Sequence, residues 1–397
     1  MDRLFIKHRN KVSLVSLDFE REIAEKIYWN ERLIGIKGAR GVGKTTLLLQ
    51  RILKSGDTEG KSLYCSLDDI YFSNTSLSEL AENFVAYGGE NLYLDEVHRY
   101  PDWSQELKNL YDDYPQLHIV FTGSSLLSLR DGKGDLSRRA MFYDMPGLSF
   151  REFINLKEKM KLKSFSLEEI FQNHVEVAMN LTKLIKPLSL FNDYLQYGYF
   201  PFFSEYPFTV QQRIAEIINI TIDVDMLQLK GLNTTGLRKL KMLLQIIADS
   251  VPFKPNITKL AERTGVNRNT LVAYLKHLDD AEIINNIYSN THGIGMLQKP
   301  EKIYLNNTAY SYTLSANIPD KGNLRETFFL SMCRRNHSLN YTSKGDFLID
   351  NKYVLEVGGK NKTSKQIQNL PDSFITADDI ETGFGEKIPL WLFGFLY

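Results

Sequence analysis

Eight consecutive residues near the start of the chain have the types and spacing of a phosphate-binding loop: Gly38, Ala39, Arg40, Gly41, Val42, Gly43, Lys44 and Thr45. Glycines let backbone N–H groups turn inward around phosphates, and a helix that begins at Lys44 adds the positive end of its dipole. The Lys44 ammonium is suited to neutralise the β- and γ-phosphates, and the Thr45 hydroxyl is suited to bind Mg²⁺. These residues, with Thr46 directly after them, are the predicted nucleotide-binding segment.

A second pattern with chemistry is an apolar run at 91–94 that ends in two carboxylates. Asp95 is suited to hold Mg²⁺ through water. Glu96 is suited to polarise the attacking water as a general base, which requires a carboxylate beside the γ-phosphate. Such a pair is common on protein surfaces, but its place after a phosphate loop favours hydrolysis of a nucleoside triphosphate.

Two further polar positions follow these motifs. Ser124 belongs to a Thr-Gly-Ser-Ser segment after an apolar run at 117–121, where it can contact the γ-phosphate or the water, or simply close a buried strand. Arg138 and Arg139 lie in a charged loop before Pro146. Arg139 is the preferred candidate for a finger that reaches the γ-phosphate of a neighbouring subunit, and a solvated arginine is the alternative.

The elements that must position these residues alternate between strand and helix. Apolar runs predict strands at 33–37, 61–67, 91–94 and 117–121, and helical periodicity predicts helices at 20–29, 45–53, 77–87 and 103–114. Strands separated by helices indicate a parallel sheet covered on both faces. The fold class is therefore α/β, with the P-loop domain over residues 1–150.

The remaining chain predicts three modules: a helical linker or lid at 151–235, a winged helix-turn-helix at 236–312, and a degenerate endonuclease-like α/β module at 318–397. The linker includes an aromatic cluster around Gly198, at 194–203, without interleaved basic residues. We therefore expect it to pack as core rather than to stack bases.

The helix-turn-helix is predicted at 257–278, with Thr258 as the first cap, Gly265 in a left-handed turn and Asn267 as the second cap. Hairpin strands at 283–288 and 302–305 would form the wing. In such a fold three polar residues of the second helix can meet DNA: Arg268, Asn269 and Lys276. Three acidic residues close that helix, which leaves DNA contact open: Asp279, Asp280 and Glu282.

The last module places Glu326 on a helix, Asp346 after Gly345, and Glu356 in a strand, which is the order of a restriction-endonuclease-like core. Active sites of that kind carry a lysine two residues after the strand carboxylate. That position is a glycine here, and Lys360 could serve only if the strand end bends back. We therefore expect an inactive interaction module.

Composition excludes several classes. Lys+Arg and Asp+Glu both number 48, so nucleic-acid or membrane contact cannot come from net charge and requires a local patch. The two cysteines suit a reducing compartment. No segment has the length and apolarity of a signal peptide or a membrane span. A cytoplasmic protein is expected, with no membrane contact.

In combination the motifs resemble a known family. The chain shows G-x-R-x-V-G-K-T-T, a strand ending in Leu-Asp-Glu-Val, Thr-Gly-Ser-Ser and Leu-Ser-Phe-Arg-Glu-Phe in that order. It is similar to prokaryotic AAA-type ATPases with a C-terminal DUF4143 region, here 190–397. The resemblance implies ATP as the nucleotide, Asp95 and Glu96 as the Walker B pair, and a sensor strand inserted between the P-loop and Asp-Glu strands. Members have Gly-Arg where this chain has Arg138-Arg139.

Three functions remain to be compared. The first is an Mg²⁺-dependent ATPase whose cycle drives a conformational switch on a DNA or protein partner. The second is an ATP-gated DNA-binding regulator with little turnover, and the third is an active nuclease. A second copy of the chain is a further expected partner, because an arginine finger acts between subunits.

Overall fold

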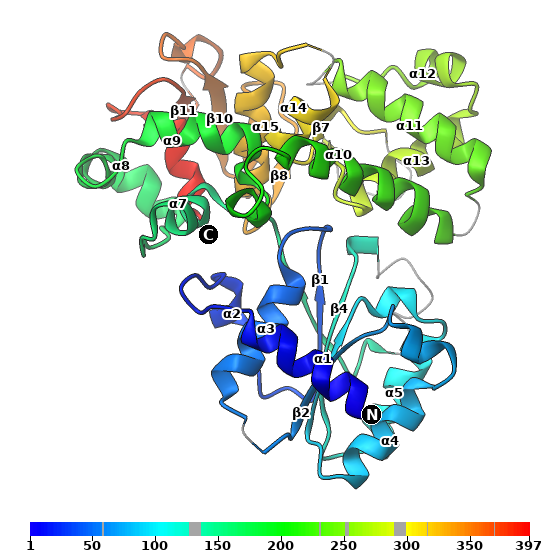
Figure 1. The fold of residues 1–397 in the computed structure, drawn as a ribbon. Coiled ribbons are helices and arrows are strands. Elements are labelled where there is room, and N and C mark those ends of the chain that lie inside the picture. The colour runs from blue at the N-terminus through cyan, green and yellow to red at the C-terminus, as the bar shows by residue number, and fades with distance from the viewer. Residues whose placement is uncertain are drawn as a thin grey trace. The chain divides into compact units, whose positions relative to one another are not determined.

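A computed structural model describes residues 1–57, 59–126, 136–229, 232–250, 254–289, 299–315, 317–368 and 370–397. The chain divides into two compact units, Met1–Gly147 and Leu148–Tyr397 (Figure 1). The first unit ends three residues before the predicted boundary at 150, and the assignment of that domain stays a prediction. The division of the second unit into three modules stays a prediction.

The first unit is built on five parallel strands: β1 (Leu33–Lys37), β2 (Ser62–Ser66), β3 (Asn91–Asp95), β4 (His118–Gly123) and β5 (Met141–Asp144). Their spatial order is β2-β3-β4-β1-β5. β4 pairs with β1 on one side and β3 on the other, so the strand after the Asp-Glu pair is inserted beside the P-loop strand. This is the strand order that the resemblance implied.

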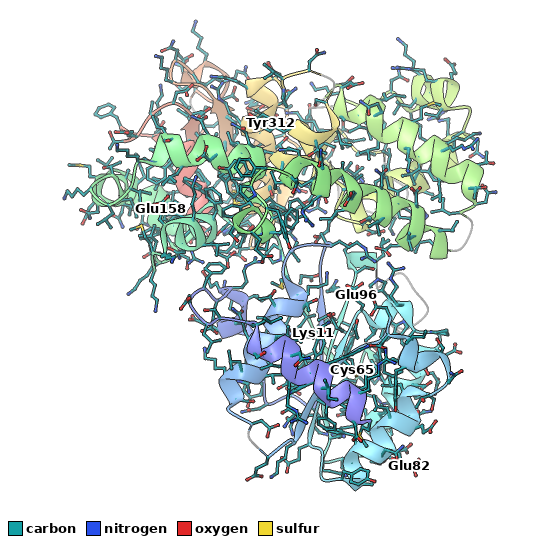
Figure 2. All side chains as sticks on the ribbon, viewed as in Figure 1. Lys11, Cys65, Glu82, Glu96, Glu158 and Tyr312 are labelled. Carbon is teal, nitrogen blue, oxygen red and sulfur yellow. The ribbon has the colours of Figure 1, made fainter. Side chains whose placement is uncertain are left out.

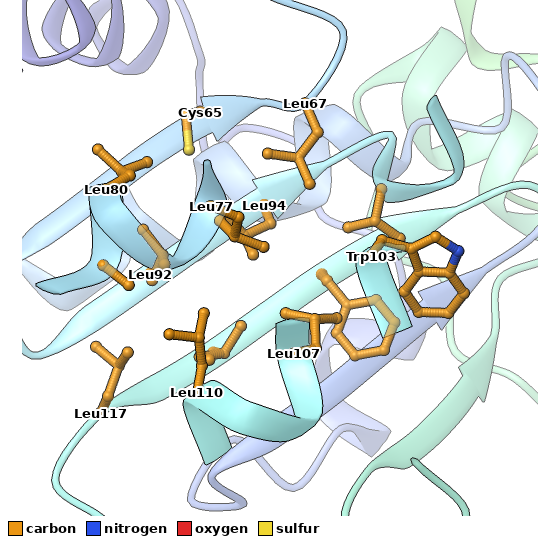
Figure 3. Close-up of a cluster of buried hydrophobic side chains, with 14 of the residues drawn as sticks. Cys65, Leu67, Leu77, Leu80, Leu92, Leu94, Trp103, Leu107, Leu110 and Leu117 are labelled. Carbon is orange, nitrogen blue, oxygen red and sulfur yellow. The ribbon is translucent and has the colours of Figure 1, made fainter. Parts of the chain in front are cut away.

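Helices flank this sheet (Figure 1): α1 (Asp2–Ser13), α2 (Ile23–Lys26), α3 (Lys44–Ser55), α4 (Leu77–Ala86) and α5 (Trp103–Asp113), with short 3₁₀ turns at Ile70–Ser73 and Val97–Arg99. One apolar cluster joins α4 and α5 to the strands (Figure 3). In it Leu92 and Leu94 of β3 meet Leu80 of α4 and Leu107 of α5, all of them buried. Alternate residues of β3 therefore anchor the strand that ends at Asp95.

The sequence-based elements of this unit differ from the structure in three places. The predicted helix at 20–29 is wrong in extent, because only Ile23–Lys26 is helical. The amino-terminal helix α1 and the edge strand β5 were not predicted. β5 has a short apolar run, Met141–Tyr143, that was passed over, and its residues are half-buried or exposed.

The second unit begins with a helical part. Its helices are α7 (Phe150–Glu158), α8 (Leu167–Thr182), α9 (Pro187–Asp193) and α10 (Val210–Ile220), with π-helical turns at Tyr194–Gly198 and Thr221–Asp225 and 3₁₀ turns at Pro201–Ser204 and Met226–Gln228. The aromatic cluster lies in the turns between α9 and α10. Tyr194 and Phe200 are buried, and the Phe153 and Phe203 rings lie 4.8 Å apart. The expectation that this cluster packs as core is confirmed.

The next part places three helices before an antiparallel strand pair: α11 (Thr234–Ala248), α12 (Ile257–Thr264), α13 (Arg268–Asp280), β6 (Ile284–Ile287) and β7 (Lys302–Leu305). Gly265 has φ +62° between α12 and α13, and Asn267 caps α13 by accepting the Thr270 N–H. The predicted cap at Thr258 is wrong, because Asn256 accepts the Lys259 N–H and Thr258 lies inside the first turn. Residues 290–298 between the two strands lie outside the described residues.

The final part is a mixed sheet beside α14 (Thr308–Leu314) and α15 (Lys321–Cys333). Its strands are β8 (Leu339–Asn340), β9 (Phe347–Ile349), β10 (Tyr353–Gly358), β11 (Ser373–Ala377) and β12 (Lys387–Pro389), with 3₁₀ turns at Ser364–Gln366 and Leu390–Phe395. The spatial order is β12-β11-β10-β9-β8. β8, β9 and β10 form an antiparallel meander, whereas β10, β11 and β12 are parallel.

Two composition-based expectations can be compared with the described residues. Cys65 and Cys333 are both buried free thiols. Among the described helices, none combines the length and the apolar character that crossing a bilayer requires.

Candidate nucleotide site

The phosphate-binding loop connects β1 to α3, at the carboxyl edge of the sheet. Gly41 and Gly43 have φ values of +78° and +99°, a region that residues with a side chain rarely adopt. Gly38 is needed for a different reason, since a Cβ there would lie 2.2 Å from the carbonyl oxygen of Met145. The Met145 N–H in turn donates to the Lys37 carbonyl at 2.7 Å. The loop is therefore packed directly against the segment that follows β5.

Lys44 is the first residue of α3, as predicted, and its side chain folds back over the loop. Nζ donates to the carbonyls of Gly38 and Ala39, at 2.8 Å each. The residue is only 5% exposed. An ammonium group held over the loop is positioned to meet an anion that the loop amides bind. Thr46, in the same first turn of the helix, is exposed.

The Asp95 carboxylate accepts hydrogen bonds from three hydroxyl groups on three different elements. Thr45 of α3 donates to Oδ2 at 2.7 Å, Tyr64 of β2 donates to Oδ2 at 2.8 Å, and Thr122 of β4 donates to Oδ1. The strand order accounts for this, because β3 lies between β2 and β4. Burial and the Asp95 charge raise the pKa of Tyr64 far above its ordinary value, so its hydroxyl stays protonated and donates. The pair predicted for Mg²⁺, Thr45 and Asp95, is in direct contact.

Glu96 follows with a left-handed backbone, φ 56° and ψ 41°. Its N–H donates to the Thr122 hydroxyl at 3.1 Å, and its side chain lies at the carboxyl edge of the sheet (Figure 2). Oε2 is 3.6 Å from Arg40 Nη2 and 3.4 Å from His98 Nε2. The predicted base is therefore next to an arginine of the loop itself. Its left-handed backbone turns the chain sharply after the apolar strand.

Ser124 is buried beside this group, and its N–H donates to His98 Nδ1 at 3.3 Å. Within the described ranges, its buried Oγ has no hydrogen-bond partner. Thr122, two residues earlier, is the residue of the segment that contacts Asp95. A sensor role for Ser124 remains a prediction. The polar Thr122 at the end of an apolar strand was a usable signal for a site residue, and it was passed over.

Arg139 lies away from these residues. Its Nε and Nη2 donate to the two carboxylate oxygens of Asp112, at 2.9 Å each. Asp112 is in the last turn of α5, just before β4 begins, and Arg139 comes just before Met141, which pairs with Ile34. Arg139 is therefore at the amino edge of the sheet, opposite the loop. It does not reach its own site, and its role as a finger toward a second copy remains a prediction.

Arg21 is a residue that sequence reasoning missed. Its buried guanidinium donates to the Val42 carbonyl of the loop at 2.8 Å. It also donates to the carbonyls of Pro146 and Gly147, at 2.8 and 2.9 Å. The loop is thus connected to the last residues of the first unit. No sequence signal could have found this contact, because the partners lie 125 and 126 positions away.

The predicted acidic residues of the second unit also converge. Asp346 Oδ2 accepts the Val357 N–H at 2.9 Å, and Lys302 Nζ is 3.4 Å from both Asp346 Oδ1 and Glu326 Oε2. Lys360, which was only a conditional candidate, is not the lysine that contacts the strand carboxylate. Lys362 reaches the strand carboxylate, with Nζ 2.5 Å from Glu356 Oε1.

Comparisons with known proteins agree with the fold and the phosphate loop of the first unit. Residues 30–154 match the family model described as an AAA domain. The parallel sheet with β4 between β1 and β3 and the glycine-rich loop agree with this similarity to an AAA-type P-loop domain. Residues 188–321 match a domain of unknown function, DUF8612. The DUF4143 region remains a prediction that this match does not support.

Among individual proteins, the chain is 29% identical over 383 residues to the uncharacterized protein MJ1637 of Methanocaldococcus jannaschii, covering 88% of this chain and 80% of that protein. AMPPCP-bound DnaA from Aquifex aeolicus is 17% identical with a TM-score of 0.28, over 65% of this chain and 85% of DnaA. The Aeropyrum pernix ORC1 protein, in complex with DNA, is 13% identical with a TM-score of 0.33, over 78% and 91%. TM-scores this low do not establish a common fold.

Proposed function

We propose that this chain is an Mg²⁺-dependent ATPase in which nucleotide at the P-loop drives a conformational change of the second unit, which acts on DNA. One observation supports hydrolysis most: the Asp95 carboxylate bridges Thr45 and Thr122, with Glu96 directly beside it. This joins the helix after the P-loop, the Asp-Glu strand and the inserted strand in one hydrogen-bonded group.

The residues fit ATP and Mg²⁺. The loop glycines leave its amides open to phosphate, and Lys44 supplies the positive charge. Thr45 and Asp95 are oxygen donors, which Mg²⁺ prefers, and they already lie in contact. When bound, Mg²⁺ would be held by Thr45 directly and by Asp95 through water, and it would stabilise the charge that develops on the transferred phosphoryl group.

Glu96 is the proposed base, and its contacts describe a resting position. Arg40 and His98 both lie within 3.6 Å of its carboxylate. A carboxylate beside an arginine is a weaker proton acceptor than a free one. Because Arg40 belongs to the loop, binding of phosphate there competes for its guanidinium. We propose that this competition releases Glu96 toward the water.

Arg21 is the proposed connection between nucleotide and motion. It holds the Val42 carbonyl of the loop and the carbonyls of Pro146 and Gly147 with one rigid group. The chain enters the second unit directly after Gly147. A change in loop conformation is therefore passed to the connecting segment through a single side chain.

DNA is the proposed partner because of α13. Arg268, Asn269 and Lys276 are exposed on it, at positions available to phosphates or bases if the helix enters a groove. The acidic residues at the end of α13 are a weaker argument against DNA contact than the sequence indicated, because two of them form ion pairs. Asp279 pairs with Arg334 at 2.9 Å, and Glu282 pairs with Arg335 at 3.1 Å.

Phosphate release tests hydrolysis. Lys44→Ala and Glu96→Gln should each reduce Mg²⁺-dependent turnover by at least about 100-fold, a typical loss for a group that acts on the transition state. Lys54→Ala is the matched control, an exposed lysine at the other end of the same helix, and it should change turnover less than twofold. Turnover that persists in both variants would refute the assignment.

The same variants distinguish the proposed ATPase from the alternative, an ATP-gated DNA-binding regulator with little turnover. It predicts little phosphate release from the wild type, together with duplex binding that ATP changes and that Arg268→Ala weakens. Our proposal predicts that Glu96→Gln binds ATP tightly and retains the ATP-dependent change in DNA affinity without turnover.

A further inference from the structure

The carboxylates of the second unit form a group that the proposed ATPase does not use. Glu326 comes from α15, Asp346 from the residue before β9, and Glu356 from β10. β9 and β10 are antiparallel with Phe347 opposite Leu355, so Asp346 lies opposite Glu356 across the ladder. Asp346 is fixed there by its own N–H, which donates to Leu355 O at 2.8 Å, and by the Val357 N–H, which donates to its side chain.

The lysine that seemed to be missing is supplied by the next turn of the chain. The Lys362 N–H donates to the Gly359 carbonyl, and this turn brings the side chain back over β10. A Cβ built at Gly358 would lie 2.6–2.7 Å from Cβ, Cγ and Cδ of Lys362. The Lys362 stem therefore fills the space of a side chain at position 358. Its ammonium reaches Glu356 Oε1 at 2.5 Å.

A separate observation indicates that Glu356 has capacity for a further partner. Its side chain is 1% exposed, and its second oxygen, Oε2, has no hydrogen-bond partner among the residues that the structure describes. A buried carboxylate oxygen without a partner costs free energy unless a cation or a donor satisfies it.

The negative charge of the three carboxylates is also not fully balanced. Lys302 lies between Glu326 and Asp346, and Tyr304 donates to Glu326 at 2.6 Å. Three carboxylates thus face two ammonium groups. Within the described parts of the chain, no group of three or more Asp, Glu, His or Cys side chains is placed to hold a metal ion together. Mg²⁺ is commonly held by only one or two carboxylates, completed by water and substrate phosphate.

We propose that Asp346 and Glu356 bind a divalent cation and that Lys362, in place of a lysine at position 358, completes a site that hydrolyses phosphodiester bonds in nucleic acid. In the reaction a water oxygen bonds to phosphorus and the bond from phosphorus to the sugar oxygen breaks. One water proton passes to that leaving oxygen, so the products are a phosphate monoester and a hydroxyl. The Lys362 ammonium stabilises the negative charge that develops on the phosphoryl oxygens.

Cleavage of labelled single-stranded and duplex DNA by the full chain, with Mn²⁺ or Mg²⁺ and without ATP, tests this proposal. Glu356→Gln and Lys362→Met should each lower cleavage by about 100-fold or more. Lys360→Met is the control for a lysine in the same turn that does not reach the site, and cleavage should stay within twofold. Phosphate release from ATP should persist in all three variants, which separates this site from the P-loop.

Moving the lysine from position 362 to position 358 distinguishes loss of the ammonium group from loss of folding. In Gly358→Lys combined with Lys362→Ala, the space that the Lys362 stem occupied becomes available to the new side chain. This variant should regain at least one tenth of the wild-type cleavage. If the wild type does not cut with either cation, the proposal is wrong, and Lys302 and Lys362 are internal counter-ions of an inactive module. Equal cleavage by the wild type and Glu356→Gln would also overturn it.

Discussion

Substitution of Arg21 by methionine tests how the loop is connected to the end of the first unit. Methionine keeps most of the apolar stem but removes the guanidinium, which is almost fully buried. Three carbonyl groups lose their donor: those of Val42, Pro146 and Gly147. A typical hydrogen bond contributes about 1 kcal/mol net, so we expect a loss of about 3 kcal/mol in the free energy of unfolding.

Urea unfolding measures this loss. With a urea dependence of about 1–3 kcal/mol per molar, a loss of that size lowers the midpoint by about 1–3 M. Lys54→Met is the control, because its exposed ion pair with Glu20 should contribute less than about 1 kcal/mol. If the midpoint of Arg21→Met equals that of Lys54→Met, the three carbonyls find other donors. The Arg21 hydrogen bonds would then contribute nothing to stability, and the proposed coupling between the loop and the connecting segment would be wrong.

Three further outcomes follow from contacts of the first unit. Gly38→Ala places a Cβ 2.2 Å from the Met145 carbonyl, so it should weaken binding of a fluorescent ATP analogue by more than about tenfold; unchanged affinity would contradict this close approach. Tyr64→Phe removes one donor to Asp95 and should lower stability by about 1 kcal/mol, measured by urea unfolding, and no change would mean that the bond contributes nothing. Burial lowers the pKa of His8 from 6.5, so the unfolded state binds more protons below that pH and stability should fall on acidification. His8→Gln should flatten this dependence, and an unchanged pH profile would refute it.

The features that could be predicted from sequence are those that local rules determine. The phosphate loop requires glycine where φ is positive, and Gly41 and Gly43 show this in the sequence itself. β1, β3 and β4 were found because each is an apolar run buried on both faces. Gly265 and Asn267 were found because a left-handed turn and a helix cap depend on single residue types.

The errors arise where distant contacts override local preference. Residues 20–29 have helical periodicity, but Arg21 is bound to three carbonyls and the Gln50 amide donates to the carbonyls of Ser16 and Phe19, so the chain is fixed in another conformation. Thr122 gained its importance from the strand order, which places it beside Asp95. Lys362 was missed because spacing along an extended strand cannot anticipate a turn that returns a side chain over Gly358.

Hydrogen exchange at residues 145–148 tests whether nucleotide at the loop alters the segment that leads into the second unit. The Met145 and Leu148 amides donate to Lys37 and Tyr199, and Arg21 ties the carbonyls between them to the loop. We predict that ATP with Mg²⁺ changes the exchange rates of these two amides in the wild type and in Glu96→Gln. The rates should stay unchanged in Lys44→Ala. Identical exchange with and without ATP in Glu96→Gln, under conditions where ATP is shown to be bound, would contradict the proposed switch.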